Sequence, residues 1–127
     1  MNQTQSYRDL IVWQRAIELV VELYAITEKF PREELFGITS QMRRAAVSIP
    51  SNIAEGRSRG TKADYLNFLR TANASGAELE TQIEISKRLP KTKTLDYSKV
   101  DKLLDEVMRG GSDAQIERAK DMLSKLS

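Results

Sequence analysis

Apolar side chains recur at alternating steps of three and four residues through most of this 127-residue chain. That spacing places them on one side of an α-helix. The pattern continues over long stretches separated by proline, glycine and polar residues, and no stretch alternates with the period of two expected of a strand. The sequence therefore predicts an all-α protein, and the short connections favour an antiparallel, up-down four-helix bundle.

The same periodicity gives approximate bounds for the helices. We expect helices over residues 9–29, 40–55 and 62–88, and a fourth helical region containing Val100, Leu103, Leu104 and Val107. A chain of 127 residues suffices for one hydrophobic core, so residues 1–127 are expected to form a single domain.

Proline and glycine locate the interruptions. Pro31 and Pro90 end helices, because the residue before a proline is disfavoured in the helical conformation. Pro50 lies inside the second helix and is expected either to kink it or to end it. Gly110-Gly111 is expected to break the fourth region, and a capping box beginning at Ser112 then starts a last helix.

The first helix carries two apolar stripes rather than one. Trp13 and Tyr24 belong to one stripe and are expected in the core, and the other includes Leu19 and Leu23. The stripes lie about 110° apart around the helix, so apolar surface covers about half of it. A small bundle needs one such stripe, and the second predicts a further packing partner such as a neighbouring subunit.

Composition limits the chemistry. The chain has no histidine and no cysteine, so it lacks the usual acid/base group near neutral pH, thiolate nucleophiles and soft zinc ligands. Glu78, Glu80 and Glu84 are better interpreted as surface charge than as a metal site. We expect no enzyme activity, cofactor or metal. The N-terminus is polar and no apolar run could span a bilayer, which predicts a cytoplasmic protein without membrane contact.

Positive charge is concentrated in the middle of the chain. Residues 38–76 hold six Lys or Arg and two Asp or Glu, whereas the whole chain has a net charge of only +2. We expect a nucleic-acid-binding surface that contacts phosphate groups through Arg43, Arg44, Arg57, Arg59 and Lys62. The alternative is a solvated polar face. No aromatic residues interleave with these cations to stack on bases.

Several segments resemble a known family. The most specific block is Arg43-Arg44-Ala45-Ala46-Val47-Ser48-Ile49-Pro50-Ser51-Asn52-Ile53-Ala54-Glu55-Gly56, accompanied by Val12-Trp13-Gln14, Phe30-Pro31, Phe36-Gly37 and Ala77-Glu78-Leu79-Glu80-Thr81-Gln82. Over about residues 7–89 the chain resembles the four-helix-bundle proteins encoded in intervening sequences of bacterial 23S rRNA genes, sometimes labelled ribosomal-protein-like. Beyond residue 89 it departs from them, because their fourth helix is uninterrupted.

The resemblance implies a ring-shaped homopentamer of four-helix subunits. Similar bundles include the accessory protein of diversity-generating retroelements, which binds a reverse transcriptase and nucleic acid through a basic surface. The resemblance therefore implies a scaffold whose partners are copies of itself and structured RNA or DNA, or a nucleic-acid enzyme such as a reverse transcriptase. A protein-interaction module without affinity for nucleic acid is the alternative.

Overall fold

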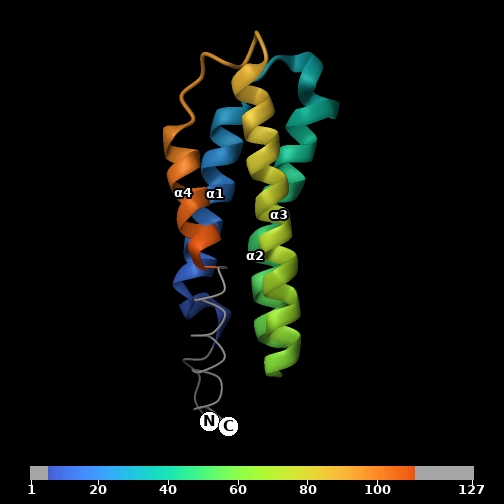
Figure 1. Cartoon of the computed structure of the whole chain (residues 1–127), viewed down its shortest axis with the longest axis vertical. Helices are drawn as coiled ribbons and strands as arrows, with labels where there is room; N and C mark the ends of the chain where they lie inside the picture. The colour runs from blue at the N-terminus through green and yellow to red at the C-terminus, as the bar shows by residue number, and fades with distance from the viewer. Residues whose placement is uncertain (1–5, 111–127) are drawn as a thin grey trace.

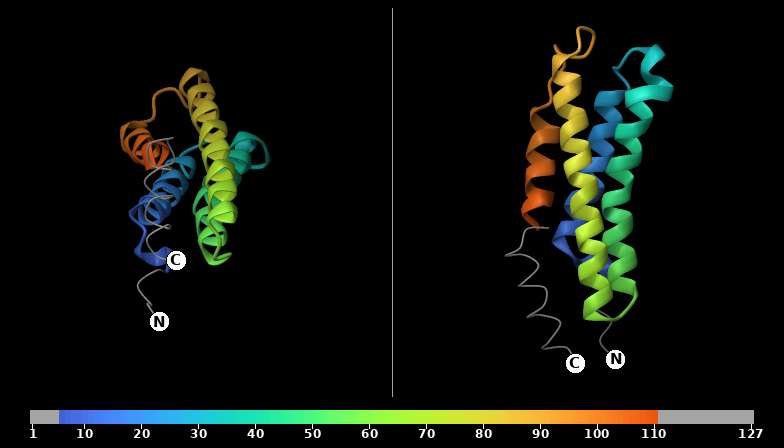
Figure 2. Two further views of the ribbon diagram at one scale, coloured as in Figure 1. Left: turned by 60° about the horizontal axis from the view of Figure 1, so that its bottom comes forward. Right: turned by 45° about the vertical axis from the view of Figure 1, so that its right-hand side comes forward.

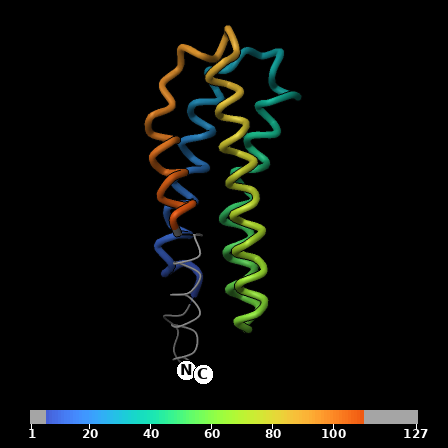
Figure 3. Tube along the Cα trace, in the orientation of Figure 1, coloured from blue at the N-terminus to red at the C-terminus, as the bar shows by residue number. Residues whose placement is uncertain are grey.

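The computed structural model describes residues 6–110, which form four antiparallel helices (Figure 1; Figure 3). The elements are η2 (Tyr7–Asp9), α1 (Ile11–Thr27), η3 (Arg32–Glu34), η4 (Leu35–Thr39), α2 (Ser40–Ser58), α3 (Lys62–Arg88) and α4 (Ser98–Gly110). No strand occurs in this part of the chain. The predicted all-α, up-down four-helix bundle is therefore confirmed.

The helices are arranged in the order α1, α2, α3 and α4 around the bundle. The most extensive contact joins α2 to α3, α1 lies between α2 and α4, and α3 and α4 contact each other sparsely (Figure 2). In Figure 1, α3 and α4 lie toward the viewer and α1 and α2 lie behind them. The α1–α2 face and the α3–α4 face are thus on opposite sides of the bundle.

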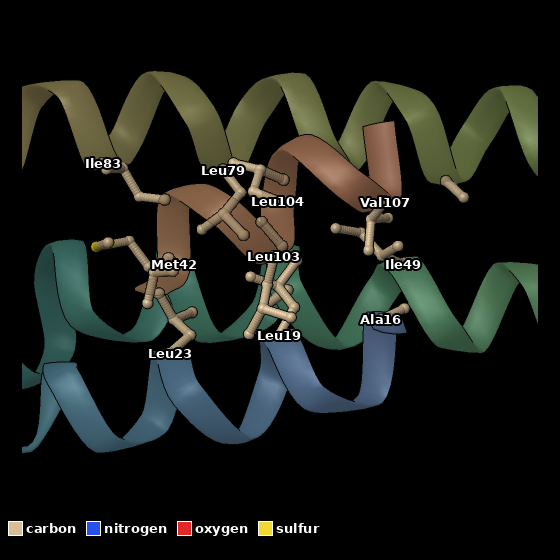
Figure 4. Packing of buried hydrophobic residues seen from close by; sticks show 14 of the residues in the cluster. Ala16, Leu19, Leu23, Met42, Ile49, Leu79, Ile83, Leu103, Leu104 and Val107 are labelled. Carbon is tan, nitrogen blue, oxygen red and sulfur yellow. The ribbon is translucent and has the colours of Figure 1, made fainter. Parts of the chain in front are cut away.

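The core lies between all four helices (Figure 4). Leu19 and Leu23 of α1 are fully buried, as are Met42 of α2 and Leu79 of α3. Leu103 of α4 points into the same cluster. Burying each large aliphatic side chain contributes about 1.5–3 kcal/mol, so this shared cluster is what holds α4 on the other helices.

Only one of the two apolar stripes of α1 enters this core. Ala16, Leu19 and Leu23 are fully buried, whereas Ile17 is 38% exposed and Tyr24 is 40% exposed. The expectation that Tyr24 lies in the core is wrong, and Trp13 is only partly buried. The reason is geometric: α2 and α4 cover the side of α1 that carries Leu19 and Leu23, whereas the opposite side is covered only in part.

Pro50 does not end the second helix. α2 continues for eight residues beyond it, to Ser58, so of the two expected outcomes, a kink or an end at Pro50, the end does not occur. Proline removes one backbone hydrogen bond from the helix. Here Ile49, Pro50 and Ile53 are all buried in the bundle, and their packing maintains the helix across the missing bond.

Small residues allow helices to approach closely. Gly56 of α2 lies against Phe68 of α3, and a Cβ added to Gly56 would be 2.5 Å from the Phe68 Cβ. Farther along the same pair of helices, the Ser48 and Ser75 hydroxyls form a hydrogen bond of 2.8 Å. Gly76 instead faces α4, where an added Cβ would overlap the Met108 sulfur. α2 and α3 therefore cross at close range.

The fourth helical region forms as predicted up to Gly110. Val100, Leu103 and Leu104 are buried on the side of α4 that faces the other helices. The expected break at Gly110-Gly111 begins where the described residues end. The expected last helix after Ser112 lies outside the described residues.

Candidate nucleic-acid interface

The five predicted phosphate-binding residues do not form one surface. Arg43 and Arg44 lie in the first turn of α2, whereas Arg57 and Arg59 lie at its opposite end, with Lys62 at the start of α3. Fourteen residues separate Arg43 from Arg57, which corresponds to about 21 Å along a helix. The single patch predicted from the segment charge is therefore wrong, and the cations fall into two groups.

Arg43 is engaged in packing α2 against α1. Its Nε donates a hydrogen bond of 2.9 Å to the Thr27 hydroxyl, and its guanidinium lies 4.5 Å from the centre of the Tyr24 ring. Thr27 is buried and donates in turn to the Leu23 carbonyl at 2.7 Å. Arg44 is exposed and forms no ion pair within residues 6–110. Arg43 therefore has a structural role that its neighbour lacks.

The second group lies at the turn between α2 and α3, and we call Arg57, Arg59 and Lys62 the turn cations. The chain reverses within three residues because Gly60 adopts a φ of 83°, which a glycine tolerates without strain. Thr61 then caps α3, because its hydroxyl accepts a hydrogen bond from the Asp64 backbone N–H. The tight turn holds three cations within six sequence positions at one end of the bundle.

Arg59 is already paired, but in an exposed position. Its guanidinium donates to the Glu55 carboxylate at 2.8 Å, and this hydrogen bond raises the pKa of Arg59. The guanidinium also lies 5.2 Å from the centre of the Phe68 ring. An ion pair with both partners about half exposed contributes little to stability, because water screens the two charges. A phosphate group can therefore compete with Glu55 for Arg59.

A further cation with aromatic neighbours was missed in the sequence. The Arg8 guanidinium lies 5.8 Å from the Tyr7 ring centre and 5.7 Å from that of Trp13, and the two rings meet edge to face at 5.3 Å. The segment η2, which carries Tyr7 and Arg8, contacts α2. It lies at the lower end of the bundle in Figure 1, as does the turn between α2 and α3. Arg8 was not among the predicted cations, and its only sequence signal was Tyr7-Arg8 shortly before Trp13. Of those that were predicted, Arg43 lies over Tyr24 and Arg59 over Phe68, although no aromatic residue alternates with them in the sequence.

Other kinds of site find no support in residues 6–110. No cluster of three or more acidic side chains in this range could hold a metal ion. None of the helices in the same range is long and apolar enough to cross a membrane.

The fold defines a four-helix-bundle protein, and three cations lie together at the turn between α2 and α3. The chain belongs to the 23S rRNA-intervening sequence protein family, because the sequence model of that family matches residues 8–110. The match includes all four described helices and confirms the resemblance that the central block indicated. It also continues to residue 110, so the predicted departure from the family beyond residue 89 is wrong. No curated protein matches the chain with significant similarity.

Proposed function

We propose that this protein is a non-enzymatic, homo-oligomeric scaffold that binds the phosphate backbone of structured nucleic acid through the turn cations. The observation that carries the proposal is the tight α2–α3 turn, which places Arg57, Arg59 and Lys62 at one end of the bundle. The segment η2, which carries Arg8, also contacts α2. Rows of guanidinium and ammonium groups recognise phosphates because of their charge and hydrogen-bond donors.

The proposed contacts are electrostatic and independent of sequence. A phosphate would displace the exposed Glu55 carboxylate from Arg59, and Phe68 beneath the guanidinium keeps it oriented. Arg8, stacked beside Tyr7 and Trp13, would contact a neighbouring phosphate. Each phosphate neutralised by a cation releases counterions, so affinity should fall steeply with salt.

Self-association is the second part of the proposal, and a pentamer is the assembly that we expect. The exposed apolar stripe of α1, which includes Ile17, Val21 and Tyr24, supports it. Exposed apolar surface of this kind is typical of interaction sites. A ring would repeat the turn cations around one rim, and their summed field would strengthen binding to a polyanion.

The binding surface can be tested with two matched double variants. Arg57→Ala/Arg59→Ala should weaken binding to a structured RNA and to a duplex DNA alike, and should reduce the slope of log affinity against log salt by about 2. Lys93→Ala/Lys102→Ala removes the same charge far from the turn and should leave binding nearly unchanged. Equal affinities for the two variants would contradict the assignment. Arg43→Ala is less informative, because Arg43 also packs α2 against α1.

The exposed apolar stripe also favours a second candidate function, a protein-interaction module without affinity for nucleic acid. Its partner could be a nucleic-acid enzyme such as a reverse transcriptase. Affinity capture after nuclease treatment distinguishes the two. A protein partner recovered in stoichiometric amount, together with no binding of purified RNA or DNA, would favour the module.

A further inference from the structure

Two depressions on opposite sides of the bundle carry opposite charge. The first is a groove of about 670 Å³ between α3 and α4, which exists because these two helices contact each other sparsely. Ile83, Ile85 and Leu104 contribute apolar surface to its walls. Its charged lining consists of four carboxylates and two cations, a net charge of −2: Glu80, Glu84, Asp101, Asp105, Lys87 and Arg88.

The second depression, of about 430 Å³, lies where η4 meets α1 and α2. Tyr24, Leu35 and Val47 line it, and each is at least 40% exposed. Its charged lining consists of Arg43 and Arg44 without any carboxylate, a net charge of +2. Phe36, next to Leu35 in the chain, is 93% exposed and lies on η4 at the rim of this surface.

Among residues 6–110, each depression includes one charged side chain that neither an ion pair nor a hydrogen bond engages. Within residues 6–110, Arg44 forms no ion pair and neither does Glu80, although Glu84, Asp101 and Asp105 each pair with a cation. The two charges also lie in the same half of the bundle. Ser86 of α3 approaches Met42 of α2 at 3.5 Å, so the start of α2 is level with the last turns of α3.

We propose that the α3–α4 groove of one subunit receives the α1–α2–η4 face of a second copy, with Arg44 opposite Glu80 of the neighbour. This inference rests on the proposed self-association and names its surfaces. The apolar side chains Leu35, Phe36 and Val47 would cover Ile85 and the groove floor. The two faces carry opposite net charges, so a groove on one subunit attracts the α1–α2–η4 face of another. Two grooves, or two α1–α2–η4 faces, would instead bring like charges together and repel each other.

The proposed contact is heterologous, because it joins two different surfaces. Each subunit then presents one donor face and one acceptor face on opposite sides, and association repeats from subunit to subunit. Such contacts produce a ring when the rotation closes and a filament when it does not. The turn cations lie at the end of the bundle away from Arg44 and Glu80, so the contact leaves them available for a polyanion.

Charge reversal tests the pairing. The mass of the wild-type protein and of Arg44→Glu, Glu80→Arg and the double variant Arg44→Glu/Glu80→Arg is measured at one concentration by size-exclusion chromatography with light scattering. We expect an oligomer for the wild type, at least a tenfold rise in the dissociation constant for each single variant, and recovery of the oligomer in the double variant. Lys93→Glu, a charge reversal on an exposed residue away from both faces, should behave like the wild type.

The outcomes separate the inference from the proposed function. A monomeric wild type would overturn the proposed self-association together with this interface. An oligomer that survives both single reversals would overturn the interface alone. Single variants that dissociate without recovery in the double variant would overturn the Arg44–Glu80 pairing, provided that far-ultraviolet circular dichroism shows both single variants to be folded.

Discussion

Replacing Gly56 with alanine should destabilise the bundle, although alanine is the better helix former. The added Cβ would be 2.5 Å from the Phe68 Cβ and 3.4 Å from the Tyr65 Cα. Optimal carbon–carbon contacts are about 3.5–4.0 Å, so α2 and α3 must separate by about 1 Å. Overpacking of this kind costs about 1–3 kcal/mol. The higher helix propensity of alanine offsets about 1 kcal/mol of this cost, which leaves a net loss of stability of up to about 2 kcal/mol.

Gly76→Ala is the matched control. Its added Cβ meets the Met108 sulfur, whereas the Cβ added at Gly56 meets the Cβ of Phe68, which cannot move without the backbone. An unbranched methionine can rotate away at small cost. We therefore expect this variant to be between unchanged and about 1 kcal/mol more stable. Urea unfolding followed by circular dichroism, at one protein concentration, measures both variants. A Gly56→Ala protein as stable as Gly76→Ala would refute the close approach of α2 and α3.

Two further predictions concern the core and the surface. Leu79→Ala removes a fully buried side chain and should lower the free energy of unfolding by about 2–5 kcal/mol. The control Ile85→Ala, at a half-exposed position, should lower it much less. Equal urea midpoints for the two variants would contradict the packing. The Lys91 ammonium donates to the Glu33 carboxylate at 2.6 Å and holds the pKa of Glu33 below its usual value. A lowered carboxyl pKa stabilises the fold above the unfolded pKa and loses that effect as pH falls through the folded pKa. Lys91→Met should therefore raise the Glu33 pKa in an NMR titration, and an unchanged pKa would contradict the ion pair.

The helices could be predicted from sequence because their signals are local. The third helix was predicted with its observed bounds, Lys62–Arg88, since Thr61 caps one end and Pro90 follows the other. Pro50 was harder, because a proline weakens a helix locally whereas the burial of its neighbours depends on the whole bundle. Local patterns also could not decide which stripe of α1 enters the core. That choice depends on where α2 and α4 pack.

The candidate site was predicted only in part, for a similar reason. Arg57, Arg59 and Lys62 are close in sequence across a turn, so they are also close in space. Arg43 was assigned to the same surface because the net charge of residues 38–76 takes no account of the length of α2 that separates it from them. Its hydrogen bond to Thr27 and its position over Tyr24 depend on how α1 packs against α2. A count of charges in the sequence gives no information about that packing.

The most direct test of the proposed function is the salt dependence of binding. Fluorescence anisotropy of a labelled duplex DNA is measured with purified, nuclease-treated protein between about 50 and 200 mM salt. One subunit offers Arg8, Arg57, Arg59 and Lys62, and four phosphate contacts give a slope of log affinity against log salt of about −3.6. An oligomer that engages the duplex with several subunits predicts a steeper slope. A shallower slope would contradict binding by several subunits at once, and no binding at the lower salt would contradict the phosphate-binding proposal itself.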